Sequence, residues 1–261
     1  MSRPQIGAKL KEHQTKGVEI MLALDVSNSM LAEDYSPDRL ERAKLAISKL
    51  VDRLRDDRIG LIVFAGSSFV QLPITTDYVS AKMFLNSIST ESVPVQGTAI
   101  GDAINTAIRS FSAQSEKSRA IIVITDGENH EDDPVAAAKQ AADMGIRVFT
   151  IGVGSSQGGP IPMDGELLRD KDGNIVVSKL DEKLLQDIAA AGNGLYVRAE
   201  NSEFGLNPII DNIRKMDEEN FNSVVFEEFD EQYMYFFAIA LVFLVLEMLV
   251  GNRRARKRLF N

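Results

Sequence analysis

Residues 17–30 read GVEIMLALDVSNSM, an apolar run that ends in Asp25 and is followed by two serines at alternate positions. The run over residues 17–24 has the length and composition of a buried β-strand. An extended chain points every second residue the same way, so Asp25, Ser27 and Ser29 are expected to face a common point just beyond that strand. One carboxylate and two hydroxyls gathered there indicate a polar site at a sheet edge.

Strand and helix patterns alternate along the rest of the chain, which predicts an α/β fold. Near-continuous apolar strands such as AIIVIT are typical of a mostly parallel sheet covered on both faces. We therefore expect a doubly wound, mostly parallel sheet with helices on both faces. The expected strands are residues 17–24, 58–66, 68–75, 118–127, 146–154 and 195–199, and the expected helices are residues 36–57, 77–89, 98–111, 134–145, 181–192 and 203–216.

Three local patterns refine this scheme. A tight glycine-serine turn between residues 58–66 and 68–75 predicts an antiparallel pair. Ser36 fits the N-cap of the helix over residues 36–57, and Pro37 fits its first position. GELLRDKDGNIVVSK has two short strands around Asp-Gly, which predicts a β-hairpin inserted at about residues 160–180.

Composition narrows the class of function. The chain has 261 residues, 44% of them hydrophobic and 26% charged, which suits a globular domain with appendages. It contains no cysteine, so disulfides and thiolate chemistry are excluded. A formal net charge of −9, with five basic residues concentrated in the last eleven, leaves an acidic body that is poorly suited to nucleic-acid binding.

The C-terminal part differs from the rest. Residues 1–16 are a polar N-terminal segment, and residues 17–216 form the predicted domain. Residues 217–232 are predicted to be an acidic linker. Residues 233–250 are apolar around every face and are predicted to be a transmembrane helix, since at ~1.5 Å per residue they span roughly 27 Å of a bilayer core of about 30 Å. Residues 251–261 contain RRARKR, the basic tail expected on the cytoplasmic side.

Two further residues are expected to join the polar site. Asp126 closes the strand over residues 118–127, and parallel strands end at the same edge of a sheet, where ligands bind in open α/β folds. Thr98 begins the helix over residues 98–111, where it could also act as a cap. Two carboxylates and three hydroxyls are all-oxygen ligands, which suit a hard cation such as Mg²⁺.

The spacing of these residues resembles the von Willebrand factor type A domain family. Asp25-Val26-Ser27-Asn28-Ser29 is that family's D-x-S-x-S motif, and Thr98 in QGTAIGDAI and Asp126 in IVITDGE stand where the family places its remaining metal-site residues. The resemblance implies a metal-ion-dependent adhesion site that holds Mg²⁺ or Mn²⁺ and leaves one position for an acidic residue of a partner. The implied metal ligands are Asp25, Ser27, Ser29, Thr98 and Asp126.

The segment from RPQIGAKL to DRLERAK looks like the membrane-anchored proteins of bacterial aerotolerance (Bat) operons, of the BatB and BatA type. The hairpin, GNGLYVRA and the single C-terminal apolar helix fit the same group. Such proteins usually carry two membrane helices before RPQ, so we expect a truncated form whose body lies outside the cytoplasmic membrane. The resemblance implies three kinds of partner: a sibling von Willebrand A protein, tetratricopeptide-repeat proteins and a MoxR-type AAA+ ATPase.

Three functions remain open at this point. The first is a membrane-anchored, metal-dependent protein-interaction module without catalytic residues or an organic cofactor. The second is a metal-dependent phosphohydrolase, although Ser27 stands where such enzymes generally have a second acid. The third is a scaffold whose metal site is occupied but functionally silent.

Overall fold

The computed structural model describes residues 5–10, 17–112, 117–129, 131–163, 165–199, 206–223, 227–231 and 237–247. The chain divides into two compact units, residues 15–221 and residues 1–14 with 222–261. The first unit contains the predicted sheet and the polar site.

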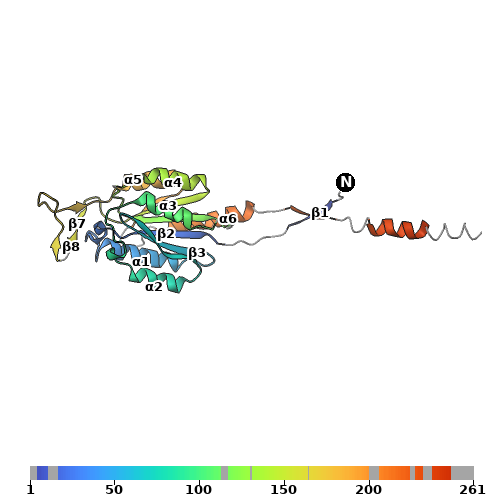
Figure 1. Cartoon of the computed structure of the whole chain (residues 1–261), viewed down its shortest axis with the longest axis horizontal. Coiled ribbons are helices and arrows are strands. Elements are labelled where there is room, and N and C mark those ends of the chain that lie inside the picture. Colours follow the sequence, from blue (N-terminus) through green and yellow to red (C-terminus); the bar gives the residue numbers. More distant parts are fainter. Residues whose placement is uncertain are drawn as a thin grey trace, which may run out of the picture. The chain divides into compact units, whose positions relative to one another are not determined.

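The first unit is built on a six-stranded sheet with the strand order β11-β6-β5-β2-β3-β4 (Figure 1). All neighbouring strands are parallel except β3 and β4, which are antiparallel as the sequence predicts. The strands are β2 (Glu19–Asp25), β3 (Arg58–Phe64), β4 (Ser68–Thr75), β5 (Arg119–Thr125), β6 (Ile146–Gly152) and β11 (Tyr196–Arg198). The doubly wound, mostly parallel arrangement is confirmed.

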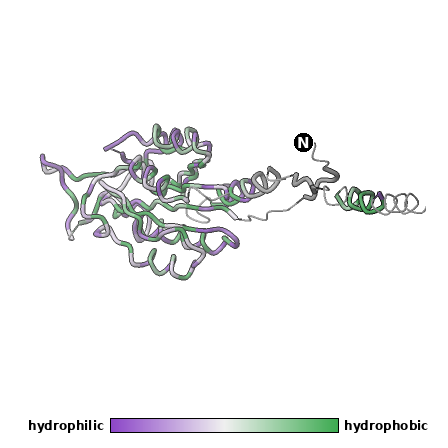
Figure 2. The backbone as a smooth tube through the Cα atoms, turned by 45° about the vertical axis from the view of Figure 1, so that its right-hand side comes forward, coloured by the Kyte–Doolittle hydropathy of each residue, from purple (hydrophilic) through white to green (hydrophobic). Residues whose placement is uncertain are grey.

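Helices cover both faces of this sheet, so that its central strands are buried on either side. One apolar cluster joins the sheet to α1, α2 and α6, and the other joins it to α3, α4 and α5. Strand β2 contributes to both, with Ile20, Leu22 and Leu24 in the first cluster and Met21 and Ala23 in the second. Figure 2 shows hydrophobic residues, in green, along the central strands. The helices are α1 (Arg39–Val51), α2 (Tyr78–Ser87), α3 (Ile100–Ser110), α4 (Pro134–Asp143), α5 (Glu182–Ala191) and α6 (Leu206–Ser223).

The expected start of α1 is wrong by two residues. The first helical residue is Arg39 instead of Pro37. Its N-cap is Asp38, whose side chain accepts a hydrogen bond from the backbone N–H of Glu41 at 2.7 Å. A carboxylate in this position satisfies one of the N–H groups that the first turn leaves unpaired.

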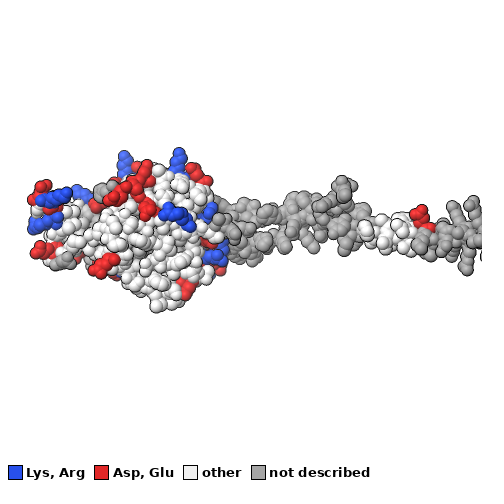
Figure 3. All heavy atoms as spheres, in the orientation of Figure 1, with Lys and Arg blue, Asp and Glu red and all other residues white. Residues whose placement is uncertain are grey.

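The predicted hairpin is present, and it contains two turns instead of one. Strands β7 (Gly159–Pro160) and β10 (Val177–Ser178) pair at its base, and β8 (Pro162–Met163) and β9 (Glu166–Leu167) form a short pair within it. The Asp-Gly turn lies between Arg169 and Ile175, which form an antiparallel bridge. Acidic and basic side chains lie close together at this end of the unit (Figure 3).

The second unit contains a strand pair that the sequence does not predict. Strand β1 (Gln5–Leu10) pairs antiparallel with β12 (Glu227–Glu231). Within residues 217–232, which are predicted to be an acidic linker, α6 extends to Ser223 and β12 follows. The role of this segment as a linker stays a prediction.

The predicted membrane helix over residues 233–250 lies only partly within the described residues. Residues 237–247 are helical, with exposed apolar side chains such as Phe237 and Phe243. In the described part of the chain no helix is both long enough and apolar enough to cross a membrane. The basic tail over residues 251–261 lies outside the described residues.

Candidate metal centre

The two predicted carboxylates end neighbouring strands of the sheet. Asp25 is the last residue of β2, and Asp126 directly follows the last residue of β5. These strands are paired in parallel, so both residues emerge at the same sheet edge. Both residues are buried. The structure therefore brings together two acids that are about a hundred positions apart in the chain.

Asp25 is held from two sides. Its Oδ1 accepts a hydrogen bond from the backbone N–H of Ser27 at 2.9 Å, and its Oδ2 accepts one from the Thr125 hydroxyl at 2.5 Å. The Thr125 oxygen itself accepts a hydrogen bond from the N–H of Gly127 at 3.0 Å, so its proton is directed at Asp25. Burial, and secondly the charge of Asp126, raise the pKa of Asp25 from 3.8 to about 7.

The two serines meet, although not for the reason that the sequence suggests. Ser27 is extended, but the residues that follow form a short 3₁₀ helix, η1 (Asn28–Leu31), in place of an extended loop. Within this turn the Ser27 and Ser29 hydroxyl oxygens lie 2.9 Å apart, and both residues are buried. The turn is closed by a hydrogen bond from the Met30 N–H to the Ser27 carbonyl at 3.0 Å. The two serine hydroxyls therefore meet through a 3₁₀ turn, and the prediction of an extended loop is wrong.

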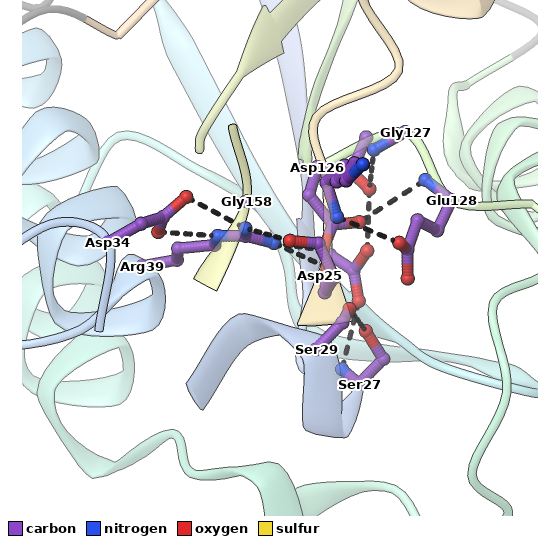
Figure 4. A network of polar contacts seen from close by, with 12 residues as sticks. Asp25, Ser27, Ser29, Asp34, Arg39, Asp126, Gly127, Glu128 and Gly158 are labelled. Atoms are coloured by element: carbon purple, nitrogen blue, oxygen red, sulfur yellow. Dashed lines mark hydrogen bonds and ion pairs between the residues drawn. The ribbon is translucent and has the colours of Figure 1, made fainter. Parts of the chain in front are cut away.

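Asp126 is paired with a buried arginine, Arg39, at the start of α1. Asp126 Oδ2 accepts hydrogen bonds from Arg39 Nη1 at 2.8 Å and from the Ser178 hydroxyl at 3.2 Å. Its Oδ1 accepts one from the N–H of Glu128 at 3.2 Å. Figure 4 shows Arg39 between Asp126 and Asp34, its second acidic partner.

Thr98 is held at the same sheet edge by a backbone hydrogen bond of its neighbour. It is buried, and the N–H of the following residue, Ala99, donates to the carbonyl of Ala65 just beyond β3. The side chain of Thr98 makes no hydrogen bond to the other four predicted ligands in the described part of the chain. The N-cap residue of α3 is Ala99, which makes no side-chain capping hydrogen bond. Instead, Asp132 accepts hydrogen bonds from the N–H groups of Gly101 and Asp102 at 3.0 and 2.6 Å.

Sequence reasoning missed Thr125, Arg39, Asp34 and Ser178. A threonine before an aspartate at a strand end gave a weak signal for Thr125. Arg39 is one of several charged residues in its helix, and the sequence does not show that it is fully buried. Ser178 lies in an inserted hairpin, where no site residue is expected. Only the three-dimensional arrangement shows that Thr125, Arg39 and Ser178 contact predicted ligands, and that Asp34 contacts Arg39.

The chemistry of the five predicted ligands fits a hard divalent cation. The polar atoms of their side chains are carboxylate and hydroxyl oxygens, which Mg²⁺ and Mn²⁺ prefer. Burial is the main cause of the raised pKa of Asp25, and a cation bound beside this residue would favour its ionised form. No group of three or more His, Cys, Asp or Glu gathers among the residues described. A metal ion here would thus depend on hydroxyl and water ligands beside the two acids.

Comparison with known proteins identifies the fold family. Residues 19–212 match the profile of the von Willebrand factor type A domain. The crystal structure of BatB from Bacteroides thetaiotaomicron, described as a conserved hypothetical protein, is 56% identical, with a TM-score of 0.75 over 77% of this chain and 100% of that one. A crystal structure of an aerotolerance-related membrane protein from Bacteroides fragilis is also 56% identical, with a TM-score of 0.74 over 76% of this chain and 100% of that one.

More distant relatives match part of the chain. An uncharacterized protein of Borreliella burgdorferi is 30% identical over 160 residues, which are 60% of this chain and 47% of that protein. The chain spans about half the length of the curated relatives that it matches. A mussel byssus protein with a zinc-occupied MIDAS motif is 19% identical, with a TM-score of 0.54 over 79% of this chain and 45% of that one, and shows the fold alone. With its sheet order, its strand-end aspartates and the match over residues 19–212, this chain belongs to the von Willebrand factor type A domain family and resembles the BatB proteins within it.

Proposed function

We propose that this chain is a membrane-anchored, metal-ion-dependent protein-interaction module with no enzymatic activity. The observation that carries the proposal is the convergence of Asp25 and Asp126, buried at one sheet edge, beside the paired hydroxyls of Ser27 and Ser29. With Thr98, these residues are the proposed ligands of Mg²⁺ or Mn²⁺. One position of the metal is left for an Asp or Glu of a partner protein.

The charges at the site suit an acidic partner group. When bound, a divalent cation supplies a position that attracts a carboxylate oxygen. Asp25 and Asp126 together balance its charge, and the buried pair of Arg39 and Asp34 adds no net charge. A further carboxylate from a partner therefore approaches a site without excess negative charge.

The geometry argues against a metal-dependent phosphohydrolase. Ser27 occupies the place of a second acid, and both oxygens of Asp25 already accept hydrogen bonds. Arg39 contacts Asp126, but it is buried and its donors are engaged by Asp34, Asp126 and Ser178. A phosphate group would find no free cation among these residues.

The proposed location is the bacterial cytoplasmic membrane. Residues 233–250 are proposed to anchor the chain, with residues 251–261 in the cytoplasm and the domain on the other side. The membrane description of the 56% identical Bacteroides fragilis protein supports an anchor. The proposed partners are a sibling von Willebrand A protein, tetratricopeptide-repeat proteins and a MoxR-type AAA+ ATPase, within an envelope or stress complex of the aerotolerance type.

Two measurements on the full chain test the proposal. Calorimetry with Mg²⁺ and Mn²⁺ measures metal binding, and a pull-down from detergent-solubilised membranes, with and without Mg²⁺, measures partner capture. We expect Asp25→Ala to abolish both while circular dichroism shows that the fold is kept. Asp143→Ala, at the exposed end of α4, is the matched control and should behave as the wild type.

The outcomes separate the three functions. Capture that persists in EDTA, or in Asp25→Ala, contradicts the proposal. Metal binding without any metal-dependent capture indicates the silent scaffold. Turnover of an aryl phosphate that disappears in Asp25→Asn indicates the phosphohydrolase.

A further inference from the structure

Arg39 uses its entire hydrogen-bonding capacity inside the protein. Nε and Nη2 donate to the two carboxylate oxygens of Asp34, each at 2.8 Å. Nη1 donates to Asp126 Oδ2 at 2.8 Å and to the Ser178 hydroxyl at 2.7 Å, and Nη2 also donates to the Ser178 carbonyl at 3.0 Å. These contacts use all five N–H groups of a guanidinium, which has five donors in a fixed planar arrangement. The side chain of Arg39 is fully buried.

Three separate parts of the chain meet at this guanidinium. Asp34 comes from the loop after η1, Asp126 from the end of β5, and Ser178 from β10 at the base of the hairpin. Asp34 also accepts a hydrogen bond from the backbone N–H of Ser155 at 2.7 Å, beyond the end of β6. One side chain therefore links a predicted metal ligand to the inserted segment.

Glycines allow this close approach. A Cβ atom on Gly154 would lie 3.0 Å from Arg39 Nε, and one on Gly159 would lie 3.1 Å from Asp34 Cβ. Gly159 pairs with Ser178 in the strand pair at the hairpin base. Both strands of that base thus lie against the Arg39–Asp34 pair, one through Ser178 and the other through Gly159.

We propose that Arg39 is a positioning residue. It holds the base of the hairpin that spans residues 159–178, together with the carboxylate of Asp126, in one fixed arrangement. The hairpin base is then a fixed wall of the site instead of a freely moving appendage. This inference rests on the proposed metal site for the role of Asp126, but the contact with the hairpin stands independently of any metal. Arg39 itself is not a proposed metal ligand.

Hydrogen exchange of the metal-free full chain tests the hairpin part. We expect Arg39→Lys, which keeps the charge but loses the forked geometry, to speed exchange in peptides covering residues 159–178 by about tenfold. Ser178→Ala removes one hydroxyl and should speed the same peptides by about fivefold. Peptides from β2 and β3 should keep the wild-type rate. Arg58→Gln, at the opposite end of the strands, is the matched control and should leave residues 159–178 unchanged.

Metal affinity tests the other part. Manganese titration should show binding weakened by about 10- to 100-fold in Arg39→Lys, as is usual when a residue orienting a metal ligand is lost. Unchanged hairpin exchange in both Arg39→Lys and Ser178→Ala overturns the proposal, and so does acceleration spread evenly over the whole domain. Wild-type affinity in Arg39→Lys overturns the positioning of Asp126. If the wild type binds no Mn²⁺, the proposed function fails while the exchange result still decides the role of Arg39 at the hairpin.

Discussion

The hydroxyl of Thr125 donates a 2.5 Å hydrogen bond to Asp25, the residue that ends the neighbouring strand. The Thr125 oxygen accepts a hydrogen bond from the Gly127 N–H, and this contact keeps the Thr125 hydroxyl proton directed at Asp25. Asp25 is thereby fixed across the sheet by a residue outside the five predicted ligands. Its other oxygen is fixed by Ser27 within its own loop.

Replacing Thr125 with valine should weaken metal binding by about tenfold, because Asp25 loses the group that orients one of its oxygens. The free energy of unfolding should fall by about 1–3 kcal/mol, since buried hydrogen-bonding groups are left unpaired. Thr150→Val is the matched control, because Thr150 is also buried and donates to the Leu185 carbonyl at 2.9 Å instead of to a proposed metal ligand. We expect a similar loss of stability there with Mn²⁺ affinity unchanged. Equal affinity in the two variants would falsify the orienting role of Thr125.

The pKa of Asp25 predicts how the metal-free protein responds to pH. Burial, and then the charge of Asp126, raise this pKa from 3.8 to about 7. Between about pH 4 and pH 7 the unfolded chain has released the Asp25 proton while the folded chain retains it, so stability falls as pH rises. Below that window Asp25 makes no pH-dependent contribution, since both states hold the proton.

Urea unfolding in EDTA at several pH values checks this effect. The comparison is between the wild type and Asp25→Asn, so that the contributions of other carboxylates cancel. We expect the variant to lose less stability than the wild type between about pH 4 and pH 7. Added Mg²⁺ should reduce the decline in the wild type, because it favours the ionised carboxylate. Parallel stability curves for the two proteins in EDTA contradict a raised pKa.

The sequence predicts the sheet and its paired aspartates because both depend on strong, local patterns. Apolar strands that are buried on two faces stand out, and parallel strands must end at one edge. Asp25 and Asp126 follow directly from that rule. The position of the hairpin follows from its Asp-Gly turn.

The rest depends on contacts between distant residues. Nothing local distinguishes Arg39, which is fully buried, from Arg42 in the same helix, which is half-buried. The pairing of β1 with β12 joins segments more than two hundred residues apart, and charged residues in both segments gave no strand pattern. The sequence places the start of α1 too early because Ser36 suits an N-cap and Pro37 suits a first helical position, whereas the cap in the structure is Asp38.

The N-cap of α1 gives a direct test of where this helix begins. Asp38→Ala should lower the free energy of unfolding by about 1 kcal/mol, because the Glu41 N–H loses its acceptor. Ser36→Ala should change stability by less than about 0.5 kcal/mol, as is usual for a surface substitution away from such features. Chemical denaturation of both variants measures the two effects. A larger loss in Ser36→Ala than in Asp38→Ala contradicts the helix start described here.

The glycine beside Arg39 gives a last test that separates backbone strain from the Arg39 contact. Gly154 has a φ of +139°, and a Cβ there would press on the buried guanidinium. Gly145 also has a positive φ, +72°, but a Cβ there meets nothing within 4 Å. Alanine at either position should cost about 1 kcal/mol or more through backbone strain. Gly154→Ala should cost more, and it alone should weaken Mn²⁺ binding, because displacing Arg39 also moves Asp126. If both variants bind Mn²⁺ as tightly as the wild type, the position of Arg39 does not control the metal site.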